Sequence, residues 1–289
     1  MDKSPNWDTS WADIDFERQT SLTTGLFSNF LDIVVPRVAQ NTKRALEIGC
    51  FPGKFIDYVG QKGYTISGID TYPRVGRIAE WASARGRDVG LFTQTTLEEY
   101  AKTSNEKFDI VLSLGFIEHF NHFCGVIFDH ATLCKTGGTV IIGAPNFASP
   151  IQRALHRVLD KDNLSNHVLE TMYPKVWAIF LRFLGFRVDY AGAIGGFDFW
   201  HETSSTNEQI TILQNLMPHL SPFVQKLGEQ FNNSESSYLA VVGTKGDMLP
   251  SREDALDFAD FCHSIAADLS IRDEALSDAG VSFLERICR

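Results

Sequence analysis

The chain has 289 residues, of which 44% are hydrophobic and 21% are charged, a composition typical of a folded globular protein rather than a disordered one. Its 36 acidic residues outnumber the 26 basic residues and give a formal net charge of -10, so we expect no nucleic-acid partner. The most apolar runs, Phe27–Val35 and Val176–Phe186, are shorter than the roughly 18 residues that a membrane-spanning helix needs.

The N-terminal stretch and the cysteines predict a cytoplasmic protein. Met1–Arg18 is polar and acidic, without the basic region and following apolar run of a secretory signal. The cysteines are odd in number and widely scattered, and none belongs to a C-x-x-C pair, which argues against a disulfide framework and against a zinc site. They are Cys50, Cys124, Cys134, Cys262 and Cys288.

Short β-type runs alternate with helical patterns along most of the chain. The expected strands are Ala45–Ile48, Tyr64–Ile69, Asp88–Thr93, Phe108–Leu114, Thr139–Ala144, Phe186–Tyr190 and Tyr238–Thr244. The expected helices are Leu22–Val34, Phe55–Gln61, Val75–Arg85, Leu97–Ala101, Phe123–Leu133, Ile151–Asp160, Pro174–Leu184 and Asn207–Leu216. This alternation indicates βαβ units, so we predict an α/β fold with a doubly wound, mostly parallel seven-stranded sheet.

The chain divides into three parts. Residues 1–41 form a helical N-terminal segment, residues 42–246 the α/β domain, and residues 247–289 an acidic helical C-terminal extension. Within the α/β domain we expect insertions at residues 147–171 and 191–236. The C-terminal extension holds ten acidic residues against four arginines and carries an apolar stripe at helical spacing. We expect it either to dock on the main domain or to bind a protein partner.

The most informative segment is ALEIGCFPGKF, which starts at Ala45. A strand that contains an acid leads through a glycine-bounded turn into a helix, and such a turn lets the backbone approach a ligand closely. The dinucleotide pattern G-x-G-x-x-G, aligned on Gly49, places Phe51 and Lys54 where glycines are required and gives Glu47 no role. A ligand with cationic amino and sulfonium groups and no phosphate suits the acid better.

This segment resembles motif I of the class I S-adenosylmethionine-dependent methyltransferases, [ED]-x-G-x-G-x-G. Glu47, Gly49 and Gly53 match the motif, and Phe51 replaces its middle glycine. Further segments resemble the family in the correct order, and the later ones are similar to ubiquinone-type methyltransferases. They are Gly68-Ile69-Asp70 after the second strand, Ile117-Glu118-His119 after the fourth, Leu133 to Pro145 around the fifth, and His167, Tyr173-Pro174 and Leu184 to Val188 beyond it.

The resemblance implies which residues hold the cofactor. Asp70 matches the acid that binds both ribose hydroxyls, a task that suits the two oxygens of a carboxylate. Thr96 stands where the family often has an Asp that contacts the adenine amino group. Residues 1–41 are expected to cover the cofactor as a lid, or to pack against the domain. The full expected set is Glu47, Gly49, Cys50, Phe51, Gly53, Asp70, Thr71, Tyr72, Thr96, Leu97, Leu114 and Glu118.

The implied reaction is methyl transfer from S-adenosylmethionine, at oxygen in preference to nitrogen or carbon. It requires alignment of donor and acceptor and removal of a hydroxyl proton, but no metal, and the sequence shows no metal-ligand cluster. His119 and His167 are the candidate bases, although each could instead be a packing or loop residue. Weaker candidates are His122, His156 and His201.

The acceptor is expected to be a small molecule, a glycan or a natural-product precursor. The helix at residues 151–161 could present cations to an anionic membrane surface, or simply a solvated polar face. Two other functions remain open: a catalytically inactive methyltransferase-like scaffold subunit and an NAD-type oxidoreductase. The cations of the helix are Arg153, His156, Arg157 and Lys161.

Overall fold

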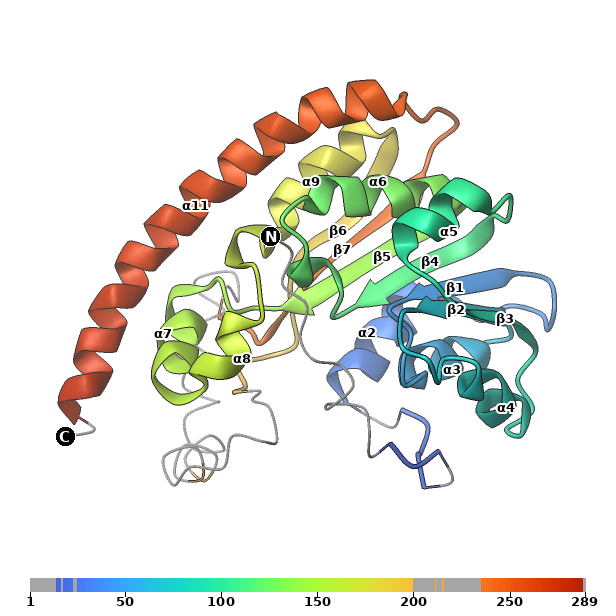
Figure 1. Cartoon of the computed structure of the whole chain (residues 1–289), viewed down its shortest axis with the longest axis horizontal. Helices are drawn as coiled ribbons and strands as arrows, with labels where there is room; N and C mark the ends of the chain where they lie inside the picture. The colour runs from blue at the N-terminus through green and yellow to red at the C-terminus, as the bar shows by residue number, and fades with distance from the viewer. Residues whose placement is uncertain are drawn as a thin grey trace.

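The structure is a computed structural model that describes residues 14–16, 18–22, 25–199, 211, 215 and 235–287. Its strands are β1 (Arg44–Ile48), β2 (Thr65–Asp70), β3 (Val89–Gln94), β4 (Phe108–Leu114), β5 (Cys134–Pro145), β6 (Phe186–Ile194) and β7 (Tyr238–Lys245). They form one seven-stranded sheet with the order β3-β2-β1-β4-β5-β7-β6 (Figure 1). All pairings are parallel except the two that β7 makes, so the sheet is the mostly parallel one that the sequence predicts.

Helices cover both faces of the sheet (Figure 1). Their bounds are α2 (Leu26–Val34), α3 (Lys54–Gly60), α4 (Arg77–Ser83), α5 (Leu97–Thr103), α6 (Phe123–Leu133), α7 (Pro150–Leu159), α8 (Lys161–Ser165), α9 (Pro174–Phe183) and α11 (Arg252–Ile287). One core lies between the sheet and α2, α3 and α4, and the other between the sheet and α5, α6, α9 and α11. Consecutive β1 residues face opposite cores, with Ala45 on the first and Leu46 on the second, as the period of a strand requires.

The predicted elements agree with the structure to within a few residues, with three differences. β5 incorporates the predicted break at Gly137-Gly138, as an irregularity in its pairing with β4. β6 continues to Ile194 because it pairs with β7 over its whole length. The acidic extension forms one helix of 36 residues, which crosses the molecule from α6 and α9 to α7 (Figure 1). Most of the helix predicted at Asn207–Leu216, and the candidate His201, lie outside the described residues.

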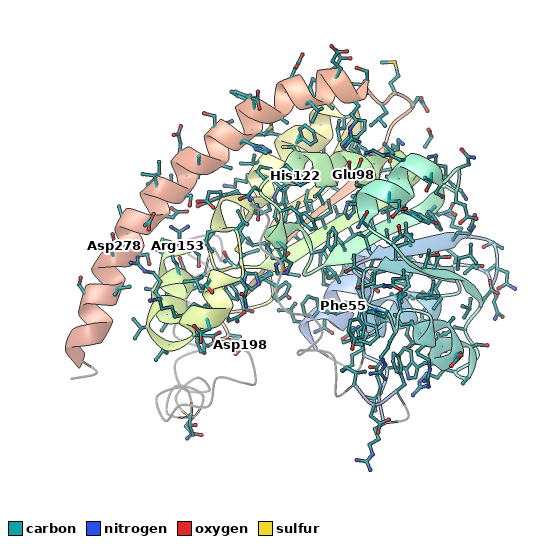
Figure 2. The ribbon with its side chains drawn as sticks, viewed as in Figure 1. Phe55, Glu98, His122, Arg153, Asp198 and Asp278 are labelled. Atoms are coloured by element: carbon teal, nitrogen blue, oxygen red, sulfur yellow. The ribbon has the colours of Figure 1, made fainter. Side chains whose placement is uncertain are left out.

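The structure corrects the prediction of a basic surface on α7. Arg153 and His156 are buried, with 2% and 0% of their surface exposed. α11 covers Arg153, whereas His156 packs against Phe147 and Phe199 and pairs with Asp160. Arg153 lies between the two helices (Figure 2) and donates hydrogen bonds to Ser270, while Arg157 pairs with Asp278. These three α7 cations are therefore directed at α11 or buried, and do not form a face for a membrane surface. None of the described helices combines the length and apolarity that crossing a bilayer requires.

The described ends of the second predicted insertion contact α7 of the first. Glu235, at the end of the second insertion, accepts hydrogen bonds at Oε2 from the Ser149 hydroxyl (2.8 Å) and the Ile151 amide (3.1 Å), so it caps the N-terminus of α7. The side-chain Nε2 of Gln152 donates to the carbonyl oxygens of Asp198 (2.9 Å) and Glu235 (3.2 Å). The described ends of the second insertion are thus tied to the N-terminus of α7.

Candidate active site

The strand order reverses between β1 and β4, and the loops that follow these strands meet there. Gly49 follows β1 with φ 68°, and Gly115 follows β4 with φ 87°. A Cβ atom on Gly49 would lie 2.8 Å from Cδ2 of Phe116, so the two loops touch and a larger residue does not fit at Gly49. In open α/β sheets the crevice at such a reversal is where ligands bind.

Glu47 organises the turn after β1. Its side chain is buried, and Oε2 accepts a hydrogen bond from the backbone N–H of Ile56 (3.0 Å) in the first turn of α3. The acid therefore satisfies one of the amides that a helix N-terminus leaves without a partner within the helix. Burial raises the pKa of Glu47 well above its ordinary value. In this chain Glu47 therefore has a structural role that does not depend on a ligand.

Asp70 ends β2 and points back at the same turn. Its Oδ2 accepts from the N–H of Phe51 (2.9 Å), and its Oδ1 accepts from the N–H of Tyr72 (2.8 Å). The N–H of Thr71 also hydrogen bonds to this carboxylate, whose two oxygens together offer about four acceptor positions. Burial raises the pKa of Asp70. The backbone amides hold a carboxylate in one orientation, suited to accept from a vicinal diol.

The ring of Phe51, which replaces the motif glycine, packs among aromatic rings. Its centroid lies 4.5 Å from that of Tyr72 and 5.7 Å from that of Phe16 in the N-terminal segment. The side chain of Gln19 donates a hydrogen bond to the carbonyl of Pro52 (2.7 Å). The described part of the N-terminal segment therefore lies over the motif I turn, in the place expected of a lid.

Four further residues expected to bind the cofactor have side chains that cap a helix or pack in the interior. Thr96 caps α5, since its hydroxyl accepts from the N–H of Glu99 (3.2 Å). Leu97 and Leu114 are buried in the two hydrophobic cores. Cys50 packs against Gly68 of β2, where a Cβ atom would lie 2.5 Å from its sulfur. These side chains therefore have structural contacts of their own.

The two candidate bases, 48 residues apart in sequence, meet in the structure. The ring centroids of His119 and His167 are 5.0 Å apart, and Nε2 of His119 lies 4.0 Å from Oε1 of Glu118. Nδ1 of His119 donates to the carbonyl of Asn166 (3.1 Å), and Nδ1 of His167 donates to that of Asn163 (2.8 Å). Because a carbonyl can only accept, each neutral ring carries its proton on Nδ1 and its basic lone pair on Nε2.

Burial sets the charge of this cluster. Glu118, His119 and His167 are all buried. Desolvation lowers the pKa of His119 to about 4, so the ring is neutral at neutral pH. Desolvation also raises the pKa of Glu118 to about 8, so its carboxyl group changes charge near neutral pH.

One carboxyl oxygen of Glu118 has no hydrogen-bond partner within the part of the chain that the structure describes, and the other lies near the loop after β4. Its Oε2 is buried without a hydrogen-bond partner among the described residues. A Cβ atom on Gly115 would lie 3.6 Å from Oε1 of Glu118 and 3.9 Å from the hydroxyl of Tyr238, so this glycine leaves space beside both groups. The charge of Glu118 and burial together raise the pKa of Tyr238, with burial the larger cause. A cation placed beside Glu118 would satisfy this orphan oxygen.

The sequence does not single out Tyr238, which lies near Glu118, or Phe27, which packs against Tyr238. Tyr238 begins β7, and Phe27 of α2 packs edge-on against it with ring centroids 4.6 Å apart. Phe27 also contacts Phe55 at the start of α3, at 4.9 Å. No local pattern could have indicated them, because they come from opposite ends of the chain and meet through tertiary packing.

The same cluster is a possible set of metal ligands. Glu118, His119 and His167 each offer one ligand atom, and these atoms lie within 4.8 Å of one another. Imidazole nitrogens and a carboxylate oxygen are common ligands of divalent transition metals. The sequence indicates no metal cluster because His167 comes from the first insertion, far from Glu118 and His119 in the chain.

Comparison with known protein families matches a methyltransferase domain model to residues 24–186. The chain is 27% identical over 159 residues to a ubiquinone biosynthesis O-methyltransferase of Xanthomonas campestris pv. campestris, which covers 53% of this chain and 66% of that protein. It is 29% identical over 119 residues to the protein of the same name from Hahella chejuensis, covering 40% of this chain and 49% of the relative. The chain thus matches 49–66% of the length of these relatives.

Two solved structures share the fold. A SAM-dependent methyltransferase from Archaeoglobus fulgidus superposes with a TM-score of 0.52 at 17% identity, covering 83% of this chain and 98% of that structure. A SAM-dependent methyltransferase from Geobacter sulfurreducens, solved with S-adenosyl-L-homocysteine, gives a TM-score of 0.50 at 18% identity, with 84% and 98% covered. At these identities the likeness establishes the fold of the described chain.

Proposed function

The chain belongs to the class I S-adenosylmethionine-dependent methyltransferases, and we propose that it transfers a methyl group to a hydroxyl oxygen of a small-molecule acceptor. The observation that carries this proposal is the buried cluster of Glu118, His119 and His167 beside the motif I turn. It combines a carboxyl group suited to a cationic cofactor with two imidazoles suited to a hydroxyl proton. The names of the relatives, which are O-methyltransferases, support oxygen as the methylated atom.

The residues around the strand reversal fit the cofactor. S-adenosylmethionine, when bound, supplies an electrophilic methyl group on a cationic sulfonium. Asp70, held by two backbone amides, would accept hydrogen bonds from the ribose hydroxyls. Glu118, with its orphan oxygen, would stabilise the positive charge. The other cofactor residues in the proposal are Glu47, Gly49, Cys50, Phe51, Gly53, Thr71, Tyr72, Thr96, Leu97 and Leu114.

His119 and His167 would act on the acceptor. A neutral imidazole whose basic Nε2 faces a buried cluster can take the proton of a hydroxyl group as its oxygen attacks. His119 is kept neutral by burial, and Asn166 fixes its ring orientation. Glu118, 4.0 Å away, can stabilise the imidazolium that forms. The surrounding aromatic side chains exclude water from the reacting groups.

Two measurements test this function. Titration calorimetry should detect binding of S-adenosylmethionine, and of S-adenosylhomocysteine, with no comparable binding of NADH. Incubation with methyl-labelled S-adenosylmethionine and fractionated small-molecule extracts should then label an acceptor, and NMR of the product, which separates methoxy from N-methyl and C-methyl carbons by chemical shift, would identify oxygen. Binding of NADH alone would support the oxidoreductase alternative. Cofactor binding without transfer to any fraction would support the scaffold alternative.

A further inference from the structure

The C-terminal helix α11 braces the elements that carry the candidate site. Near its start, Arg252 pairs with Asp129 of α6 (2.7 Å) and lies over the ring of Phe128. Farther along, Ser270 accepts both hydrogen bonds from Arg153 of α7. α6 follows the loop that holds His119, and α7 leads through α8 to His167. The position of α11 therefore bears on both histidines.

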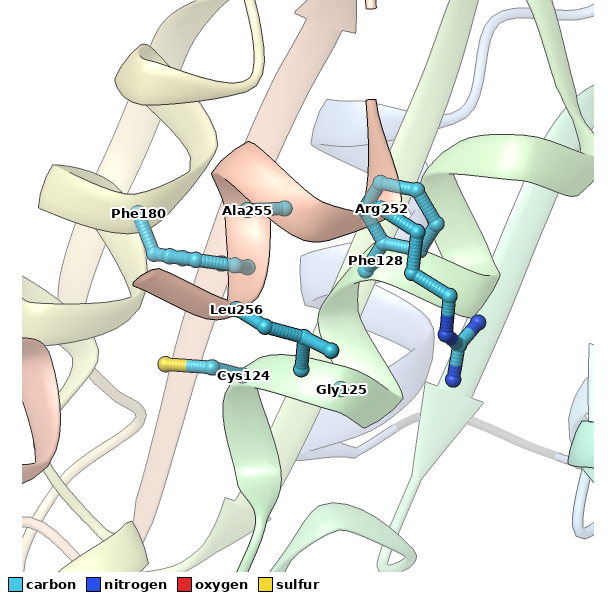
Figure 3. A pocket seen from close by; sticks show the side chains of 7 residues that line it. All are labelled: Cys124, Gly125, Phe128, Phe180, Arg252, Ala255 and Leu256. Carbon is cyan, nitrogen blue, oxygen red and sulfur yellow. The ribbon is translucent and has the colours of Figure 1, made fainter. Parts of the chain in front are cut away.

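Two cysteines meet in the seam between α6 and α11. Cys124 and Cys262 are completely buried, and their thiols hydrogen bond to each other. The adjacent residues also face each other across the two helices: the rings of Phe123 and His263 stack with centroids 4.5 Å apart and an interplanar angle of 16°. Figure 3 shows Cys124 on α6 beside Leu256 of α11. Two sulfur atoms from distant parts of the chain are thus already in contact.

We propose that Cys124 and Cys262 form a redox-sensitive dithiol, whose oxidation to a disulfide fixes α11 onto α6. Both cysteines are free thiols in the structure. The other described cysteines have different surroundings: Cys50 packs on Gly68, and the thiol of Cys134 donates to the carbonyl of Lys135. The proposal concerns the docking of α11 and does not depend on the proposed methyl transfer.

The chemistry requires an oxidant of the disulfide class, for which oxidised glutathione serves. Cys262 lies on α11, whose local opening exposes it to the oxidant, and its hydrogen bond with Cys124 lowers its pKa, so Cys262 is the first nucleophile. Its thiolate attacks one sulfur of oxidised glutathione and releases a glutathione thiolate. The thiolate of Cys124 then attacks the Cys262 sulfur of this mixed disulfide and releases the second glutathione thiolate. Two protein thiols become one disulfide, oxidised glutathione becomes two glutathiones, and both thiol protons pass to the released thiolates.

Burial of both sulfurs makes the reaction depend on α11. The oxidant reaches Cys262 only when the helix opens locally, and re-docking then brings Cys124 onto the mixed disulfide. The new bond would close a loop of more than one hundred residues and disfavour undocking of α11. Reduction would restore the hydrogen-bonded thiol pair.

The test uses the full chain in glutathione redox buffers. After alkylation of remaining thiols and proteolysis, mass spectrometry should find a linked peptide pair containing Cys124 and Cys262. The oxidised protein should have a Tm higher by at least about 5 °C than the reduced protein. Cys124→Ser and Cys262→Ser should abolish the linked pair and the Tm difference, whereas Cys134→Ser should keep both. The reduced-state Tm of each variant shows whether it is folded.

Three results would overturn the proposal. The first is stable glutathionylation without a Cys124–Cys262 link, even a few degrees below the Tm, where local opening is frequent. The second is preferential linkage of another cysteine pair. The third is a Cys124–Cys262 link that forms without raising the Tm, since such a bond would not fix α11.

Discussion

The guanidinium of Arg153 donates from Nη1 to the carbonyl oxygen and from Nη2 to the hydroxyl of Ser270, each at 3.1 Å, across the junction of α7 and α11. The side chain is buried, and so is that of Ser270. A charged group at this position must keep its hydrogen bonds, because burying a charge without partners is costly. This contact makes the C-terminal extension part of the folded domain.

Arg153→Ala should therefore destabilise the protein by about 2–4 kcal/mol, through the lost hydrogen bonds and the space left in the junction. Denaturant unfolding followed by circular dichroism measures the change. Arg157→Ala is the matched control, because its pair with Asp278 is largely exposed and should contribute less than about 1 kcal/mol. Equal losses for the two variants would show that Arg153 does not hold the junction.

Gly49→Ala should weaken both folding and cofactor binding. The residue has φ 68°, and a Cβ atom would meet Phe116 at 2.8 Å, so the substitution adds strain and a clash of about 1–3 kcal/mol together. Gly76→Ala is the control, since its φ is -59° and a Cβ atom would meet nothing within 4 Å. The control should be neutral or slightly stabilising in the same unfolding measurement. A Gly49 variant as stable as the control would contradict the assigned turn geometry.

Asp70→Ala should weaken S-adenosylmethionine binding by about 1–3 kcal/mol, or roughly 5- to 150-fold in Kd, by removing the diol acceptor. Calorimetry measures the affinity directly. Asp109→Ala provides the comparison, because that carboxylate also accepts a backbone N–H, from Arg44 at 2.9 Å, but lies at the start of β4, away from the motif I turn. The Asp109 variant should keep its affinity for the cofactor. An unchanged Kd for the Asp70 variant would show that Asp70 does not bind the ribose hydroxyls.

Glu118 should link cofactor binding to pH. Its pKa is about 8, so the carboxyl group is mostly protonated at pH 7, and a cationic cofactor that favours the ionised form should displace a proton. Calorimetry at pH 7 in buffers of different ionisation enthalpy should reveal proton release, which Glu118→Gln reduces. Protons released by the cofactor itself contribute equally for the parent protein and the Glu118→Gln variant, so they cancel in the difference between the two. Identical proton release would exclude ionisation of Glu118 on binding.

The same pKa has a consequence for stability. The folded-state pKa of Glu118, about 8, lies above its ordinary value of 4.5, so the folded protein binds more protons between these values. Glu118 therefore lowers the free energy of unfolding as pH rises from about 4.5 to 8. The Glu118→Gln variant should lose less stability than the parent over this range, and urea unfolding at pH 5 and pH 8 checks the sign.

Loss of either candidate base should reduce catalysis more than binding. With an acceptor from the labelling screen, His119→Gln or His167→Gln should lower kcat about 10²- to 10⁴-fold if that ring takes the proton, with the Kd of S-adenosylmethionine little changed. His122→Gln tests a neighbouring imidazole outside the cluster and should keep most of its kcat. Full kcat in both cluster variants would show that neither histidine is the base.

Local patterns in the sequence were sufficient for the sheet, the helices and the first turn. Apolar alternation and glycine positions are features of a few neighbouring residues, so they predict local structure directly. Examples are the β1 strand, the turn in which Gly49 has a positive φ, and the position of the Asp70 carboxyl group. The same locality explains the error on α7. Arg153 and His156 have the spacing of a polar helix face, but periodicity cannot reveal that α11 supplies the partners of Arg153, or that Asp160 and two aromatic rings surround His156.

Tertiary structure alone decided what surrounds the reacting groups. The meeting of His119 with His167, the approach of Tyr238 and Phe27, and the pairing of Cys124 with Cys262 join segments that are between 48 and more than 200 residues apart. Such contacts depend on how whole layers pack, and burial then shifts the pKa values of Glu118 and His119 in opposite directions. The amino-acid order therefore determined the family and the scaffold, whereas the charge state and the neighbours of the candidate site followed from packing, because desolvation depends on everything that covers a group.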